Sequence, residues 1–140
     1  MPTAYLALGS NLGDRRRYLQ QAIDSLQDAG IVIVKKSSLI ETDPVGGPKQ
    51  GKYINGVIEI NTVLPAEALL ILTQSIEKKL GRIKKEINGP RIIDIDILWY
   101  DDIKLITPDL LIPHPRMFER DFVMKPLKQI APRLCASYIR

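Results

Sequence analysis

An isoleucine-rich stretch in the second half of the chain carries two aspartates at alternate positions. The stretch from Ile92 to Tyr100 reads IIDIDILWY, so Asp94 and Asp96 should share one face of a strand, with Tyr100, while Trp99 joins the isoleucines opposite. The aspartate β-carbons should lie roughly 6 to 7 Å apart, because a strand rises about 3.3 Å per residue. Aspartate is disfavoured in strands, and burying two carboxylates is costly, so a positive group should face them.

Basic side chains gather just before this strand. The segment from Lys78 to Arg91 holds six cations against the single acid Glu86. Mg²⁺ typically takes one or two protein carboxylates and completes its shell with water and substrate phosphates. The cationic side of a phosphate clamp would come from Arg82, Lys84, Lys85 and Arg91. The two aspartates alone also fit a solvated or salt-bridged edge strand, and the neighbouring cations favour a metal-assisted polyphosphate site instead.

Other polar and aromatic residues are weaker signals. His114, the only histidine, lies between two prolines and fits a hydrogen-bonded turn, and a lone histidine makes no zinc site. The stretch GSNLGD at 9–14 lacks the Walker spacing and reads as a strand exit with a helix cap. Core packing explains the rings of Tyr53 and Phe122, although together with Asn55 they would form a flat slot for a heterocycle.

The composition is that of one soluble globular domain spanning residues 1–140. Hydrophobic residues make up 45% of the chain and charged residues 26%, which excludes a disordered or membrane-embedded class. A net charge of +4 favours an anionic partner. The N-terminus has no signal-peptide pattern and Cys135 is the only cysteine, so we expect a cytoplasmic protein.

The hydrophobic periodicity predicts the elements that must position these residues. We expect strands at 5–9, 31–40, 53–63 and 92–100, a helix from Tyr18 to a stop at Gly30, and a helix from Pro65 to Gly81. Gln74 and Glu77 should lie off the apolar stripe of the second helix. Loops should cover 43–52 and 82–90, and the tail should add a strand near 110–112 and helices around Met117 and Leu127. This order predicts a ferredoxin-like α+β fold, βαββαβ, with helices on one face of the sheet plus short C-terminal elements.

Taken together, these stretches resemble the 6-hydroxymethyl-7,8-dihydropterin pyrophosphokinase family. The resemblance runs in order along nearly the whole chain, through AYLALGSNLGD from Ala4, SSLIETDPVG from Ser37, YIN from Tyr53, LLILTQSIEKKLGR from Leu69, GPRIIDIDIL from Gly89, IPHPRMFERDFV from Ile112 and PLKQIAP from Pro126. The fifth and sixth stretches are highly specific when they occur together. They include the aspartate pair and His114.

The resemblance implies an enzyme that transfers diphosphate from ATP to the hydroxymethyl group of the pterin and releases AMP. It implies two Mg²⁺ ions on Asp94 and Asp96, and catalytic roles for Arg82, Arg91 and both aspartates. The implied ATP contacts are Gln74, Glu77, Arg82, Lys84, Arg91, Ile97, Leu111, His114 and Arg120. The implied pterin contacts are Thr42, Val45, Tyr53, Asn55 and Phe122. The implied partners are these two small molecules, without nucleic acid or membrane, and we expect a monomer.

The chain departs from the family pattern in three places. Asn88 stands where many members have tryptophan, in a loop that looks one residue shorter; Lys84 replaces an arginine of some members; and the chain stops soon after PLKQIAP. Two alternatives remain open. A catalytically weakened pterin- or nucleotide-binding protein fits these departures. A ferredoxin-like nucleic-acid-binding module fits the basic charge, but the chain lacks the stacking-aromatic motif of such modules.

Overall fold

The computed structural model describes residues 1–44, 50–81 and 91–138. In these ranges the elements are β1 (Thr3–Ser10), α1 (Arg15–Asp28), β2 (Val32–Lys36), β3 (Ile40–Thr42), β4 (Tyr53–Asn61), α2 (Ala66–Lys79), β5 (Asp94–Tyr100), β6 (Leu105–Ile106), β7 (Leu111–Ile112), the 3-10 turn η1 (Met117–Glu119), α3 (Asp121–Ile130) and α4 (Pro132–Tyr138). The main sheet has the order β2-β4-β1-β5, with β3 paired to β4, and its pairings are antiparallel. The predicted ferredoxin-like α+β arrangement is confirmed.

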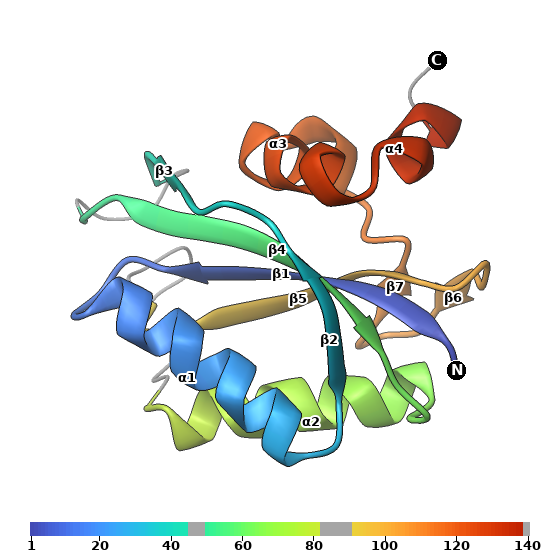
Figure 1. The fold of residues 1–140 in the computed structure, drawn as a ribbon, viewed down its shortest axis with the longest axis horizontal. Helices are drawn as coiled ribbons and strands as arrows, with labels where there is room; N and C mark the ends of the chain where they lie inside the picture. The colour runs from blue at the N-terminus through green and yellow to red at the C-terminus, as the bar shows by residue number, and fades with distance from the viewer. Residues whose placement is uncertain (45–49, 82–90, 139–140) are drawn as a thin grey trace.

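Helices cover both faces of the sheet (Figure 1). On one face α1 and α2 enclose the larger core, which includes Leu6, Leu26 and Leu69, all fully buried. On the other face α3 and α4 enclose a second core, which includes Val57 and Leu127. The expected helices on one face are α1 and α2, and the expected tail elements cover the second face. No helix in the described ranges is long and apolar enough to cross a membrane.

A bulge in β5 corrects the predicted placement of two aromatic residues. Leu6 pairs with Ile97 and Tyr5 pairs with Trp99, so Leu98 is an extra residue on its strand. An extra residue reverses the alternation of side chains beyond it. Tyr100 therefore packs in the larger core and Trp99 against the second core, where its ring centroid lies 5.6 Å from that of Tyr5. The prediction that Trp99 sides with the isoleucines and Tyr100 with the aspartates was wrong.

The strand predicted at 31–40 is divided into β2 and β3. The break follows Lys36, where the backbone N–H and carbonyl of Val57 bond to the hydroxyl and N–H of Ser37, at 2.8 and 2.9 Å. The backbone N–H of Ser38 donates to Oε1 of Gln129 on α3 at 2.6 Å, so a tail helix ties down the break. These hydrogen bonds join residues far apart in the sequence, so local periodicity contains no information on them. The division leaves β3 free to carry Thr42 to the start of β4.

Candidate active site

A cavity of about 180 Å³ lies on the α3 side of the sheet. Seven of the predicted site residues line it: Thr42, Tyr53, Asn55, Asp94, Asp96, Arg120 and Phe122. They come from three strands and from the start of α3. The expected acidic pair and the expected aromatic slot therefore belong to one cavity, although up to 80 residues separate them in the sequence.

The floor of the cavity is the central strand β1, whose small residues leave the space open. Gly9 is the register partner of both Asn55 on β4 and Asp94 on β5, so these three residues form a row across the sheet. A β-carbon at Gly9 would lie 2.9 Å from Oδ1 of Asn55, which is closer than such contacts allow. Ala7 is partnered in the same way with Val57 and Asp96. Sequence reasoning missed both floor residues, since their role depends on the register.

The aromatic wall is braced by a buried amide. Asn55 is 7% exposed, and its Nδ2 donates to Oγ1 of Thr42 at 2.6 Å. Thr42 is the register partner of Tyr53, which brings the ring and the amide onto adjoining positions of the β3–β4 pair. On the facing side, the guanidinium carbon of Arg120 lies 5.5 Å from the ring centroid of Phe122, within cation–π distance. These contacts orient the amide of Asn55 between the rings of Tyr53 and Phe122.

The acidic wall is formed by Asp94 and Asp96, as predicted, on the pocket side of β5. Both residues are half-buried. They are the only two carboxylates of β5, and in the described ranges no group of three His, Cys, Asp or Glu side chains forms a ready-made metal site. Two carboxylates suit Mg²⁺, which fills its remaining positions with water and phosphate oxygens. The donor set therefore fits an ion that arrives with a phosphate ligand.

The outer edge of β5 is covered by contacts that hold the acidic wall. Oε2 of Glu77 accepts the backbone N–H of Ile95 at 2.9 Å, directly between the two aspartates in sequence. The backbone carbonyl of Leu98 accepts the N–H of His114 at 2.8 Å. Glu77 is 4% exposed, so the prediction that it lies off the buried face of its helix was wrong. Its burial is compensated by the otherwise unpaired N–H of an edge strand.

Arg91 lies at the entrance to β5 and carries an unsatisfied donor. Its Nη1 is buried and has no hydrogen-bond partner among the described residues. Its backbone N–H donates to Oδ1 of Asn11 at 2.8 Å, and its carbonyl accepts the N–H of Asn11 at 3.0 Å. A buried, unpaired guanidinium N–H is costly, and an anionic oxygen would satisfy it. Asn11 belongs to the GSNLGD turn, which the sequence suggested only as a cap.

His114 is held as a neutral hydrogen-bonding group. Its Nδ1 accepts the backbone N–H of Arg116 at 3.3 Å, which leaves Nε2 as the ring's donor position. Burial lowers the pKa of His114 from its ordinary value, and the positive charge of Arg120 lowers it further. The predicted turn role is thus confirmed. The ring does not line the cavity described above.

The remaining predicted residues lie elsewhere or outside the described ranges. Gln74 is exposed on α2 and Leu111 is exposed on β7, whereas the side chain of Ile97 points into the larger core. None of these three lines the cavity. Val45, Arg82, Lys84, Lys85 and Asn88 lie outside the described residues. Conversely, Asp43 and Arg116 line the cavity without having been predicted. Both are exposed polar residues of irregular segments, which no periodicity singles out.

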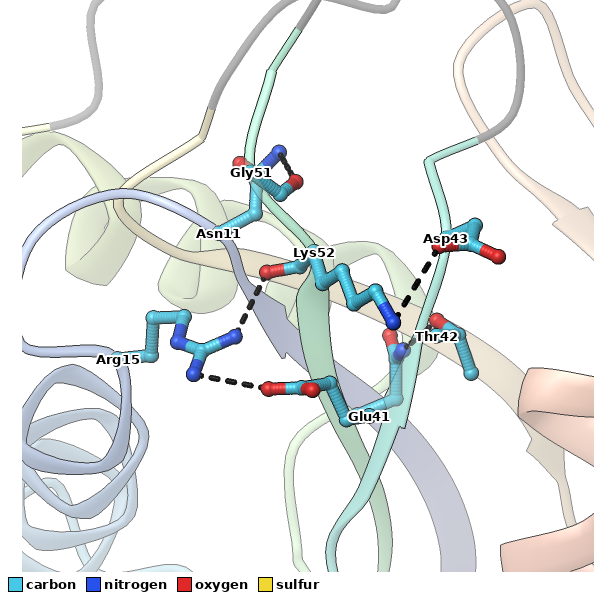
Figure 2. Close-up of polar contacts among 8 residues, drawn as sticks. Asn11, Arg15, Glu41, Thr42, Asp43, Gly51 and Lys52 are labelled. Atoms are coloured by element: carbon cyan, nitrogen blue, oxygen red, sulfur yellow. Dashed lines mark hydrogen bonds and ion pairs between the residues drawn. The ribbon is translucent and has the colours of Figure 1, made fainter.

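The stems of the 43–52 segment are joined to the start of α1 (Figure 2). Arg15 donates from Nη1 to the carbonyl of Lys52 at 2.9 Å, and its Nη2 lies 3.0 Å from Oε2 of Glu41. Nζ of Lys52 lies 3.8 Å from Oδ1 of Asp43 across the base of the segment. The start of α1 therefore holds both stems next to the aromatic wall.

Comparison with known proteins gives the family. Residues 5–132 match the family described as 7,8-dihydro-6-hydroxymethylpterin-pyrophosphokinase (HPPK). The chain is 48% identical over 132 residues to the 2-amino-4-hydroxy-6-hydroxymethyldihydropteridine pyrophosphokinase of Bacillus subtilis, covering 94% of this chain and 79% of that protein. It is 43% identical to a bifunctional protein FolKE of Lactococcus lactis, covering 93% of this chain and 38% of the relative. A Plasmodium falciparum HPPK-DHPS structure matches the fold, with a TM-score of 0.70 at 18% identity, over 94% of this chain and 40% of that one. The chain therefore belongs to the HPPK family.

Proposed function

We propose how this pocket serves the reaction of the HPPK family, the transfer of a pyrophosphoryl group from ATP to 6-hydroxymethyl-7,8-dihydropterin in folate synthesis. The observation that carries the proposal is that one cavity holds both the acidic pair, Asp94 and Asp96, and the ring slot of Tyr53, Asn55 and Phe122. A diphosphate transfer needs such an arrangement, because the metal-bound phosphate and the acceptor hydroxyl must meet.

Asp94 and Asp96 would hold two Mg²⁺ ions. Their half-buried carboxylates line the cavity, and their donor set leaves coordination positions for phosphate oxygens. When bound, the ions would neutralise charge on the triphosphate and make the β-phosphorus more electrophilic. Glu77, through its bond to Ile95, would keep the aspartates at a constant position along β5.

The triphosphate would be clamped by cations. Arg120 lines the cavity and the buried Nη1 of Arg91 needs an acceptor, so both would donate to phosphate oxygens. We extend the set by the family pattern to Arg82, Lys84 and His114, with Gln74, Glu77 and the backbone of Ile97 and Leu111 on the nucleotide side. These groups act by positioning and by stabilising charge, and both effects lower the barrier of phosphoryl transfer.

The pterin would stack between Tyr53 and Phe122. Asn55 would hydrogen-bond the edge of the heterocycle with its amide, oriented by Thr42, and the backbone around Val45 would complete the pocket. This orientation would direct the hydroxymethyl group along the sheet toward Asp94, the neighbour of Asn55 in the row through Gly9. The ring slot combines two aromatic side chains with the polar groups of Asn55 and Thr42, as expected of a site that orients one flat heterocycle.

A direct assay tests the proposal. The purified chain with ATP, Mg²⁺ and the pterin should form AMP and the pterin diphosphate in equal amounts, and omission of the pterin should suppress AMP. Binding of both substrates without AMP would instead indicate the catalytically weakened protein. Binding of RNA without a response to Mg-ATP would indicate the nucleic-acid module. Titration of Mg²⁺ against the bound nucleotide analogue should give two ions per chain.

We also propose that residues 1–140 act as one cytoplasmic domain and as a monomer. The packing supports a single domain, since β1 and β4 contribute to both cores of the sheet. Light scattering at assay concentrations checks the oligomeric state, and a mass near that of a single 15.8 kDa chain is expected. A stable dimer would overturn this part of the proposal without affecting the pocket.

A further inference from the structure

Asn11 is a buried polar residue that joins three separate segments. It is 6% exposed. Its Oδ1 accepts the backbone N–H of Arg91 at 2.8 Å, while its Nδ2 donates to Oε1 of Gln50 at 2.7 Å and to the carbonyl of Gly51 at 3.0 Å. Its own backbone N–H donates to the carbonyl of Arg91 at 3.0 Å. Both N–H groups of the amide and its oxygen are therefore used.

The two bonds to Arg91 fill a gap in the sheet. From Leu6 onward, strand β1 pairs regularly with β5 as far as Gly9 and Asp94. Continuing that register would bring Asn11 opposite Ile92, but Asn11 binds Arg91 instead, one residue earlier. At this point the backbone groups of the two segments no longer face each other in register. The side-chain oxygen of Asn11 therefore accepts the backbone N–H of Arg91 in place of a backbone carbonyl. The asparagine thereby sets where Arg91 enters the strand that carries both aspartates.

The other two bonds reach the pterin side of the cavity. Gln50 and Gly51 lie just upstream of Tyr53, separated from it by Lys52, and Tyr53 is the first residue of β4 and a wall of the ring slot. A β-carbon at Gly51 would meet the carbonyl of Asn11 at 3.4 Å, so the two backbones are in close contact there. One amide thus touches the segment before the aromatic wall and the segment before the acidic wall.

We propose that Asn11 is a positioning residue for the transfer reaction. It sets the backbone of Arg91 so that the unpaired Nη1 is presented to the phosphates, and it holds the Gln50–Gly51 segment at a matching distance on the pterin side. It acts through Arg91 and through the start of β4, and it touches neither substrate. This role rests on the proposed phosphate contact of Arg91.

A double-mutant cycle on nucleotide binding tests the link to Arg91. The measurement is calorimetric titration of α,β-methylene-ATP with Mg²⁺ into the wild type, Asn11→Ala, Arg91→Ala and the double variant. Asn11→Ala should weaken binding by roughly 5- to 30-fold, within the range of coupled neighbours, and by about twofold or less when Arg91 is already alanine. Additive losses would overturn the role, because a purely structural residue would weaken binding in both backgrounds.

Thr62→Ala is the matched control. Thr62 is also a buried polar residue whose Oγ1 accepts a backbone N–H, that of Leu64 at 3.0 Å, but it follows the far end of β4. Thermal unfolding should show a loss of stability in both single variants. Nucleotide affinity at a temperature where both are folded should fall only for Asn11→Ala, and an equal fall for Thr62→Ala would overturn the proposal.

Asn11→Asp distinguishes the side-chain contact to Arg91 from the contacts to Gln50 and Gly51. It also replaces Asn11→Ala as the test if the alanine variant does not fold. Aspartate keeps an oxygen for the N–H of Arg91 but has no donor for Gln50 and Gly51. We expect pterin affinity, measured with the analogue bound, to fall more than analogue affinity. An equal or opposite ranking would overturn the pterin-side half of the role. Failure of the wild type to bind the analogue would overturn the proposed function itself, whereas normal wild-type binding with an unaffected Asn11→Ala variant would remove Asn11 alone.

Discussion

Single residues of this pocket act through their register in the sheet. Gly9 pairs with Asp94 on one side and with Asn55 on the other, so a carboxylate and an amide flank a residue without a side chain. Glycine there provides room, since the backbone conformation requires nothing unusual. The absence of a β-carbon at Gly9 thus leaves room for the amide of Asn55, and we expect substitutions of single lining residues to affect one substrate at a time.

Asp96 is the proposed metal ligand whose removal should have the largest effect on activity. Asp96→Ala should lower formation of the pterin diphosphate by roughly 100-fold or more, as removal of a preorganised electrostatic group does, while the fold persists. The coupled AMP assay measures the rate and circular dichroism checks the fold. Asp102→Ala removes an exposed carboxylate just after the same strand and should retain full activity. Turnover near normal in the Asp96 variant would refute the metal role.

Gly9 offers a test of the floor. In Gly9→Ala the new methyl group would displace Oδ1 of Asn55, which lies 2.9 Å from it. The KM for the pterin should rise by about 10-fold, corresponding to about 1.4 kcal/mol, and the KM for ATP should change little. In an Asn55→Ala background the same methyl meets no amide and should have no further effect. An equal rise in the KM for the pterin and in the KM for ATP would contradict this prediction, because it would mean that the methyl group disturbs the whole floor of the cavity.

At the scale of elements, β5 depends on a neighbouring helix. It is an edge strand, and Glu77 on α2 supplies the acceptor that the sheet lacks at Ile95. A buried carboxylate is an unusual choice for that task, but an N–H left unpaired in the interior would be destabilising. The strand that carries the two aspartates is therefore held on one side by β1, and on the other side the described contacts include the carboxylate of Glu77 and the backbone N–H of His114.

Glu77→Ala should reduce both stability and activity. We expect the free energy of unfolding to fall by about 1 to 3 kcal/mol, because the N–H of Ile95 loses its acceptor inside the protein. Urea unfolding gives the stability and the AMP assay gives the activity. Ser75→Ala, on an exposed position of the same helix, should change neither. If the Glu77 variant kept wild-type stability, the bond to Ile95 would not be holding the strand.

The turn after β7 should make stability depend on pH. Burial lowers the pKa of His114 below its ordinary 6.5, and so does Arg120. As the pH falls below 6.5 the unfolded chain takes up this proton before the folded chain does, so the free energy of unfolding should fall until the folded pKa is reached. His114→Gln should lack this component. Urea unfolding of both proteins at pH 7.5 and at pH 5, each roughly a unit or more from the ordinary pKa of histidine, measures this component. Equal losses of unfolding free energy in the two proteins would contradict the assignment to His114.

Across the whole molecule, the order of the helices and strands could be predicted from the sequence better than the contacts between them. Alternation and caps located β1, α1, β4, α2 and β5 to within a few residues, and the aspartate pair with its lining partners followed from strand geometry and from family resemblance. The bulge at Leu98 and the burial of Glu77 were not predicted. Both depend on hydrogen bonds between distant segments, and a period read along one strand contains no information on them.

Each of the two cores contains a fully buried leucine that a helix contributes. Leu127 on α3 and Leu26 on α1 are both fully buried, on opposite faces of the sheet. Either Leu→Ala change should cost about 2 to 5 kcal/mol of stability through the cavity it leaves. Only α3 carries Phe122 into the pocket, so Leu127→Ala should also raise the KM for the pterin at a temperature where both variants are folded. The Leu26→Ala variant is the matched control, and an identical pterin KM in the two would mean that α3 holds its ring independently of the core beneath it.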